Sequence, residues 1–131
     1  MPYAEGASPV ERAAAAEIIG RVGEANDDPV KQKALDLLFR FLLIENDVDV
    51  RDALAAGVCL IWGSRGEEEA PLALIRHANA NVRYAVAKYL GLGTTDAPEE
   101  APRRAALEVL KDDPDEGVRK WAVFGLETLT L

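Results

Sequence analysis

The sequence predicts an all-α protein: a right-handed superhelix, or α-solenoid, of about seven helices, with three helical hairpins following an N-terminal capping helix. Three observations support this prediction. A short helical segment recurs along the chain, a residue suited to capping a helix precedes each copy by a fixed distance, and most spacings between copies leave room for one further helix. The clearest copy occupies residues 79–91.

Each copy of the recurring segment begins at a valine and carries apolar side chains four, five and eight residues beyond it. These offsets fall on one face of an α-helix, so each copy is expected to bury the same face against a neighbour. The copies begin at Val30, Val50, Val82 and Val118. Three residues before each valine is a side chain whose oxygen can cap the helix start: Asp27, Asp47, Asn79 and Asp115.

The first helix is expected to follow Ser8, because Ser8, Pro9 and Glu11 form a capping-box pattern with proline in the first turn. It is predicted to run to about Ala25 and, having only a narrow apolar stripe, to cover the core from one side. The next helix starts near Pro29 and is apolar on nearly every side. This pattern predicts that the second helix lies at the centre of the core.

The later elements follow from the spacing of the copies. The Val50 copy is predicted to end at about Trp62, before the turn residues 63–66. The spacing from Val30 to Val50 is too short for another helix, so Val30 falls on the first helix of a pair, whereas each later spacing holds one more helix. The whole chain, 1–131, is therefore predicted to be a single domain, with a tail at 1–7, a capping helix at 8–25, and hairpins at 28–62, 67–91 and 98–130.

The composition narrows the class of function. With 15 basic against 23 acidic residues the formal net charge is −8, which repels phosphate backbones and disfavours nucleic-acid binding. No apolar stretch is long enough to span a membrane, and residues 1–6 lack the pattern of a signal peptide, so a cytoplasmic protein is expected. The single cysteine, Cys59, is interpreted as a small buried apolar residue.

Residues with catalytic or metal-binding chemistry do not form a recognisable motif. His77 is the only histidine, and its spacing from Cys59 and the acidic residues does not match a zinc site. Ser8 and Ser64 lie at a helix cap and in a loop rather than in a Gly-x-Ser-x-Gly turn, and residues 63–66 lack the lysine of a phosphate-binding loop. We therefore predict a protein that is not an enzyme and that binds no cofactor or metal.

An arginine follows the capping residue by four positions in three copies. The pairs are Asp47 with Arg51, Asn79 with Arg83, and Asp115 with Arg119. A row of arginines can bind an anion, but each guanidinium can also bond the capping side chain and neighbouring loop carbonyls. We expect the structural role, in which the arginines form a ladder between repeats.

Aromatic and basic side chains at three further repeat offsets are the candidate binding residues: Tyr84, Lys88, Lys120, Trp121 and Phe124. These positions point away from the apolar stripe. In a superhelix whose second helices line the concave face, they are expected to form the floor of a groove. Tyr and Trp favour such surfaces because they bury a large area with few rotatable bonds. The alternative is that Trp121 and Phe124 cover the open C-terminal end of the array.

The pattern Asp/Asn-x-x-Val-Arg, followed by an alanine-rich helix and Leu-Gly, resembles HEAT repeats over about residues 28–130. Residues 113–126 look like the Val-Arg-x-Trp-Ala-x-Phe-Gly-Leu motif of small bacterial HEAT-repeat proteins, of the HEAT-like type named after phycobiliprotein lyases. The resemblance implies an α-solenoid fold, which hosts many unrelated binding roles.

We therefore expect a non-enzymatic protein-binding module or scaffold, monomeric or dimeric end to end, whose partner is another protein rather than nucleic acid or a membrane. Its small size and acidity point to an adaptor or to an immunity-type inhibitor of a basic toxin. Two alternatives stay open. One is an accessory or catalytic component of bilin (tetrapyrrole) attachment, which the lyase-type resemblance implies; the other is a DNA-binding HEAT-like protein of the alkylation-repair glycosylase kind, which requires a basic groove.

Overall fold

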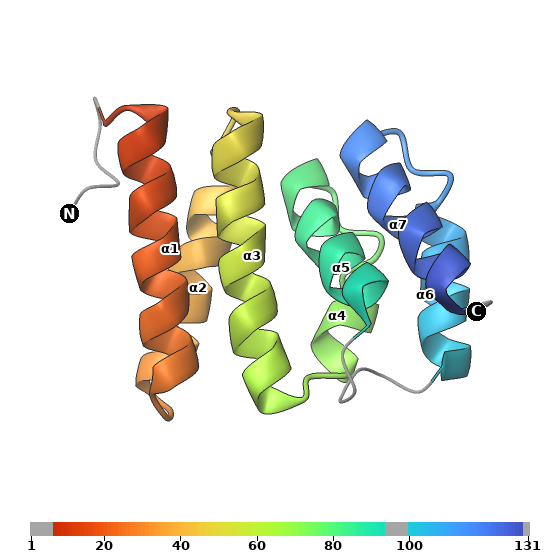
Figure 1. Ribbon diagram of the computed structural model, residues 1–131, viewed down its shortest axis with the longest axis horizontal. Coiled ribbons are helices and arrows are strands. Elements are labelled where there is room, and N and C mark those ends of the chain that lie inside the picture. Colours follow the sequence, from red (N-terminus) through yellow and green to blue (C-terminus); the bar gives the residue numbers. More distant parts are fainter. Residues whose placement is uncertain (1–6, 94–99, 130–131) are drawn as a thin grey trace. The chain divides into compact units, whose positions relative to one another are not determined.

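The computed structural model describes residues 7–93 and 100–129, and over these residues it contains seven α-helices and no strand (Figure 1). The chain divides into two compact units, Met1–Ile61 and Trp62–Leu131. Completely buried aliphatic side chains occur in both units. The all-α fold predicted from the periodicity is therefore confirmed for the described part of the chain.

The first unit consists of α1 (Pro9–Ala25), α2 (Val30–Leu42) and most of α3 (Val48–Arg65). In this unit α1 packs along α2, and a pair of glycines brings α1 close to α3. A Cβ atom added to Gly20 would lie 2.7 Å from the Cα atom of Gly57. Only glycine permits two helix backbones to approach so closely, so these two residues set the separation of α1 and α3.

The helix predicted to lie at the centre of the core, α2, buries one face only. Its buried residues are Lys31, Ala34, Leu35, Leu38, Phe41 and Leu42. Leu43 and Ile44, directly after the helix, are 51% and 72% exposed. The prediction of a helix covered on nearly every side is therefore wrong for α2, because Val30 is exposed, Leu37 and Phe39 are only partly buried, and Leu43 and Ile44 lie beyond its end.

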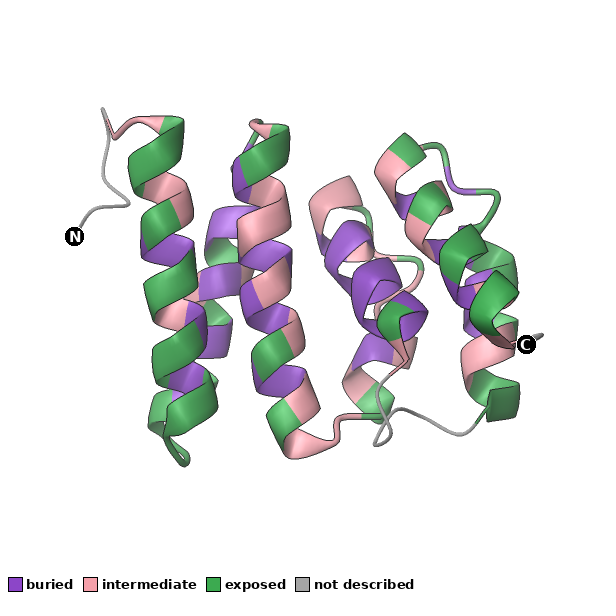
Figure 2. Cartoon of the chain, viewed as in Figure 1, coloured by how far each residue is buried: buried purple, intermediate pink, exposed green. Residues whose placement is uncertain are grey.

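The second unit contains α4 (Glu69–Ala73), α5 (Ala80–Leu92), α6 (Glu100–Leu110) and α7 (Glu116–Leu129). In α5 every residue from Tyr84 to Gly91 is buried, as the uninterrupted purple segment in Figure 2 shows. A Cβ atom on Gly91 would lie 2.5 Å from the carbonyl oxygen of Trp121, and one on Gly125 would lie 2.7 Å from the Cα atom of Gly91. A second glycine pair thus brings α5 and α7 into backbone contact.

Three of the four predicted capping residues act as caps. The side-chain Oδ1 atoms of Asp47, Asn79 and Asp115 each accept a hydrogen bond from the backbone N–H three residues later, at 3.0, 3.2 and 3.0 Å. The fourth, Asp27, does not cap its helix: α2 has Pro29 at its N-cap and no side-chain cap hydrogen bond. Proline at this position fixes the start of α2 three residues after Asp27.

Three expectations about α3 are wrong. The helix continues past the predicted end at Trp62 to Arg65, and the left-handed backbone that ends it belongs to Gly66, with φ of 61°. Gly63, expected in the turn, is a helical residue with no atom within 4 Å of an added Cβ. Cys59, interpreted as buried, is partly exposed on the same helix.

The capping box predicted at the start of α1 is confirmed. The Ser8 hydroxyl accepts from the Glu11 backbone N–H at 3.2 Å, and the Glu11 carboxylate accepts from the Ser8 backbone N–H at 3.1 Å. The hydrogen bond from the Ser8 backbone N–H to the carboxylate, and after it the interaction of the carboxylate with the Ser8 side chain, hold the pKa of Glu11 below its ordinary value of 4.5. The bonds to the carboxylate therefore stabilise α1 more when Glu11 is ionised than when it is protonated.

We expect Glu11→Gln to change the pH dependence of stability. Because the pKa of Glu11 is lowered in the folded protein, its contribution is complete above the unfolded pKa and is lost as the pH falls through the folded pKa. Glutamine still accepts the hydrogen bond but does not titrate. Thermal unfolding followed by circular dichroism from neutral to acidic pH should show wild type losing more stability than the variant; parallel curves would contradict the prediction.

Candidate functional site

Four of the predicted binding residues form one cluster between α5 and α7. The indole Nε1–H of Trp121 donates to the hydroxyl oxygen of Tyr84 at 3.2 Å. The ammonium nitrogen of Lys88 lies 5.4 Å from the centroid of the Trp121 ring, and the rings of Trp121 and Phe124 meet edge to face at 5.7 Å. Cation–π and edge-to-face contacts of this kind favour particular orientations of an aromatic side chain.

Exposure separates these residues into two groups. Tyr84 and Lys88 are each only 9% exposed, Trp121 is partly exposed, and Phe124 is 46% exposed. The expectation that Tyr84 and Lys88 form an open groove floor is therefore wrong. The contact between Gly91 and Gly125 brings α5 and α7 close together. The side chains of Tyr84 and Lys88 are therefore buried between these helices, where both contact the indole of Trp121.

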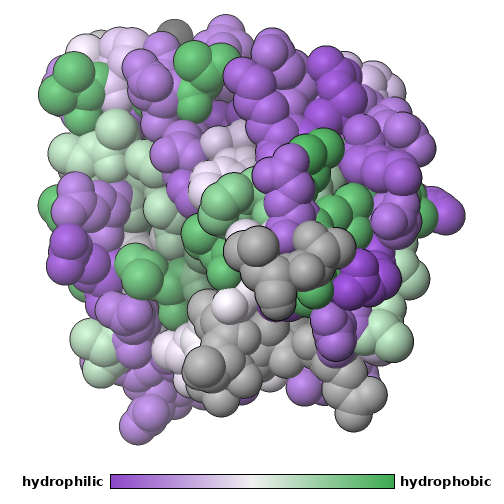
Figure 3. All heavy atoms as spheres, turned by 45° about the vertical axis from the view of Figure 1, so that its right-hand side comes forward, coloured by the Kyte–Doolittle hydropathy of each residue, from purple (hydrophilic) through white to green (hydrophobic). Residues whose placement is uncertain are grey.

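The exposed side of α7 carries Lys120, the fifth predicted residue, together with Phe124 of the cluster. We call this side the α7 ridge and define it by Glu116, Lys120, Val123, Phe124 and Glu127. The Lys120 ammonium lies 3.3 Å from the Glu116 carboxylate, and both side chains are more than 70% exposed. The ridge borders a shallow hollow of about 480 Å³, which Lys111 and Arg119 also line. Figure 3 shows the side of the molecule that carries α6 and α7, where hydrophobic side chains lie among hydrophilic ones.

Lys111 and Arg119 form the basic rim of this hollow. A hydrogen bond and the negative charge of Glu108, 2.6 Å from the Lys111 ammonium, raise the pKa of Lys111. The Arg119 guanidinium donates to the carbonyl oxygens of Asp113 and Pro114, both at 2.8 Å. The α7 ridge therefore has an apolar centre flanked by charges of both signs.

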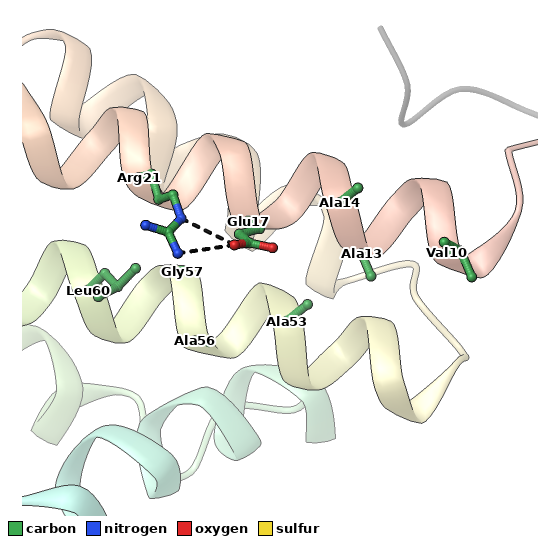
Figure 4. Close-up of a pocket in the computed structure, with 9 residues that line it drawn as sticks. All are labelled: Val10, Ala13, Ala14, Glu17, Arg21, Ala53, Ala56, Gly57 and Leu60. Atoms are coloured by element: carbon green, nitrogen blue, oxygen red, sulfur yellow. Dashed lines mark hydrogen bonds and ion pairs between the residues drawn. The ribbon is translucent and has the colours of Figure 1, made fainter.

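A second surface feature, which sequence reasoning missed, is a groove between α1 and α3 in the first unit. This α1–α3 groove has a volume of about 510 Å³. It is lined by Val10, Ala13, Ala14, Glu17, Arg21, Ala53, Ala56, Gly57 and Leu60 (Figure 4). From the sequence, the first helix was predicted to serve only as a cap. The alanines of α1 and α3 that line the groove could have indicated it, because small side chains leave space between two helices.

Arg83, one of the predicted ladder arginines, makes a bidentate ion pair in the second unit. Arg83 Nε and Nη2 donate to the two carboxylate oxygens of Asp113 at 2.7 and 3.2 Å, and both side chains are largely buried. Arg83 Nη1 donates to the carbonyls of His77 and Ala78 at 2.7 and 3.1 Å. The bonds to loop carbonyls are of the kind expected for the predicted ladder. The side-chain partner of Arg83 differs from the prediction: it is Asp113 and not the capping residue Asn79, whose side chain accepts from the first turn of α5.

The first unit contains a pair of the same kind. Arg12 Nε and Nη2 donate to the two carboxylate oxygens of Glu45 at 2.9 and 3.0 Å, and Arg12 Nη1 donates to the carbonyl of Ala7 at 2.6 Å. The Glu45 side chain is 2% exposed. Arg51, placed in the ladder by the sequence, is half-buried and donates its backbone N–H to the Asp47 carbonyl at 2.9 Å.

The sequence reasoning missed a repeated acceptor two residues before each cap. Glu45, His77 and Asp113 accept a hydrogen bond from the backbone N–H of Asp47, Asn79 and Asp115, respectively, at 3.1, 3.0 and 2.9 Å. The signal was available, because all three lie five residues before the repeat valine. At this position His77 acts as an acceptor within its own loop.

The described residues do not bring His, Cys, Asp or Glu side chains together in a group of three or more that could hold a metal ion. Within the same ranges, none of the helices has the length and apolar character needed to cross a membrane. The arrangement that the residues do build is an exposed ridge on α7 and a groove in the first unit.

Comparison with known proteins agrees with the helical architecture. The profile of the family described as HEAT repeats matches residues 35–127, which is more than half of the chain. A search of curated proteins and a search of solved structures gave no match. Repeats of this class stack into arrays that commonly present binding surfaces to other proteins. The periodicity, the seven helices of the described residues and the profile match together show that the chain belongs to the HEAT-repeat family.

Proposed function

We propose that this protein is a non-catalytic protein-binding module and that the α7 ridge, supported by the cluster beneath it, makes the contact. The observation that supports this proposal is Phe124, a large apolar side chain that is 46% exposed yet held edge to face against Trp121. A rigid, exposed aromatic residue at the centre of a mixed-charge surface is typical of the residues that contribute most to protein association.

Tyr84 and Lys88 have a positioning role in this proposal. The Tyr84 hydroxyl accepts from Trp121, and Lys88 lies over the Trp121 ring. Both are buried, so a partner at the ridge meets Trp121 and Phe124 while the two residues below restrict the orientation of the indole. Pre-organised side chains lose little conformational entropy on binding, which favours affinity.

We propose a cytoplasmic module comprising residues 1–131 that acts as an adaptor or as an immunity-type inhibitor of a basic protein. The formal net charge of −8 supports a basic partner, because opposite net charge speeds encounter. Bilin attachment and DNA binding are the rival functions, and they are tested directly by the appearance of a coloured adduct with bilin and by salt-dependent retention on DNA.

The test is affinity capture from a lysate of the source cell, followed by measurement of the affinity for the captured protein. We expect Phe124→Ala to weaken that affinity about tenfold or more. Val109→Ala is the matched control, since Val109 is an exposed aliphatic residue on α6 and lies outside the ridge. Tyr84→Phe should weaken binding by a smaller factor, because it removes only the hydrogen bond to Trp121.

Each variant is first compared with wild type by thermal unfolding, so that loss of folding is not mistaken for loss of contact. A captured protein whose affinity is the same for wild type, Phe124→Ala and Trp121→Ala would show that the binding surface lies elsewhere. A coloured bilin adduct, or DNA retention that weakens with salt, would replace the proposed function by the corresponding rival.

A further inference from the structure

The α1–α3 groove is elongated. Its lining runs along α1 from Val10 to Arg21, eleven positions or about 16 Å of helix, and α3 contributes Ala53 to Leu60 on the other side. Small residues form the part of the groove nearest Val10, and the ion pair between Glu17 and Arg21, at 3.1 Å, lies toward the other end (Figure 4). This shape fits about three turns of a helix with bulky apolar side chains.

The α7 ridge has the matching length and the complementary shape. It runs from Glu116 to Glu127, again eleven positions, with Val123 and Phe124 protruding at 42% and 46% exposure. Its ion pair, Glu116 with Lys120, has the same spacing and the same order along the helix as Glu17 with Arg21. In both pairs the acidic residue precedes the basic residue by four positions, and both pairs are well exposed.

Two helices that carry such pairs complement each other when they run antiparallel. With Lys120 opposite Glu17, Glu116 falls opposite Arg21, because both spacings equal one helical turn. In the same register Phe124 and Val123 fall opposite Ala13 and Ala14, in the apolar part of the groove. The alignment thus matches both ion pairs and both apolar residues of the ridge, while Glu127, at the end of the ridge, falls opposite Val10 at the end of the groove.

We propose that the α7 ridge of one molecule docks antiparallel in the α1–α3 groove of a second copy of this chain. This inference rests on the proposed function in taking the α7 ridge as a protein-binding surface, and it identifies one partner. The groove is preferred over a second ridge as the receptor because Phe124 protrudes, and a protruding side chain packs best into a hollow with a small-residue floor.

The test uses two charge exchanges that preserve composition, net charge and the ion pair within each helix. The α7 exchange combines Glu116→Lys with Lys120→Glu, and the α1 exchange combines Glu17→Arg with Arg21→Glu. Sedimentation equilibrium over a range of concentrations gives the dissociation constant of each protein. Either exchange alone places like charges opposite each other and is expected to raise that constant about tenfold, whereas both together should restore it to within about threefold.

Phe124→Ala provides a second, uncharged measurement and is expected to raise the dissociation constant about tenfold. Circular dichroism of every variant establishes that it is folded. A protein that stays monomeric up to about 1 mM would overturn the proposal. A dissociation constant that neither exchange changes would also overturn it, because that is the result expected if two α7 ridges pair with each other. A dissociation constant that falls with a single exchange would overturn it too, because that is the result expected for parallel docking.

These outcomes are separable from those of the proposed function. If the chain is monomeric but captures a different protein through Phe124, the second copy is excluded as a partner while the role of the α7 ridge is retained. If the chain self-associates with the expected response to the exchanges but Phe124→Ala leaves capture of other proteins unchanged, the further inference holds and the ridge is not their binding surface.

Discussion

Replacing Asp113 with alanine is expected to lower the free energy of unfolding by about 2–4 kcal/mol, although Asp113 lies outside the α7 ridge. Its carboxylate accepts two hydrogen bonds from Arg83 and one from the backbone N–H of Asp115. The side chains of Arg83 and Asp113 are 14% and 7% exposed, so removal of the carboxylate leaves a largely buried guanidinium without its counter-charge. Urea unfolding at neutral pH measures the loss.

Asp112→Ala is the matched control for this substitution. Asp112 is the preceding residue and is exposed, so its replacement should change the free energy of unfolding by no more than about 0.5 kcal/mol. The double variant Arg83→Leu with Asp113→Leu should lose less than the sum of the two single variants, because it removes both charges together. Equal losses for Asp112→Ala and Asp113→Ala would show that the ion pair does not stabilise the second unit.

Adding one methyl group at Gly91 is expected to destabilise the protein by at least about 1 kcal/mol. Alanine is intrinsically favoured over glycine by up to about 1 kcal/mol inside a helix, and Gly91 lies in the last turn of α5, so a substitution there without a steric cost would be neutral or stabilising. At Gly91, however, the new Cβ would lie 2.5 Å from the Trp121 carbonyl oxygen, a backbone atom that cannot rotate away. The contact between α5 and α7 must therefore open.

The same substitution at Gly63 has the opposite expected sign. Gly63 is a helical residue of α3 with nothing within 4 Å of an added Cβ, so Gly63→Ala should raise the free energy of unfolding by about 0.5–1 kcal/mol. Urea unfolding of Gly91→Ala and Gly63→Ala measures how the same added methyl group changes the free energy of unfolding at a crowded and at an open position. If both variants were stabilised, backbone contact at Gly91 would not limit the packing of α7.

The sequence predicted the features that depend on neighbouring residues. The capping box at Ser8 and the caps at Asp47, Asn79 and Asp115 join residues three positions apart, and the structure places them as expected. Helix ends were less well predicted. α3 passes through Gly63 because a glycine in a helix costs only about 1 kcal/mol, which the tertiary contacts of a long helix can offset.

Features that join distant residues could not be predicted in the same way. The Arg83 guanidinium bonds Asp113, thirty positions away, rather than the cap in its own helix, and periodicity does not identify a partner at that range. Exposure was also misjudged: Tyr84 and Lys88 lie off the apolar stripe, yet both are buried. The apolar stripe identifies the residues of the main core. The burial of Tyr84 and Lys88 depends instead on the close approach of α5 and α7, which Gly91 and Gly125 permit.

The two tryptophans of this chain lie in very different surroundings. Trp62 is 1% exposed and packs edge to face on Tyr89, whereas Trp121 is partly exposed and directly supports Phe124 on the α7 ridge. A water-soluble quencher should therefore reach the indole of Trp121 and leave that of Trp62 emitting. The intrinsic fluorescence of the unlabelled protein consequently gives an optical signal of whether the α7 ridge is covered, with Trp62 as the internal reference.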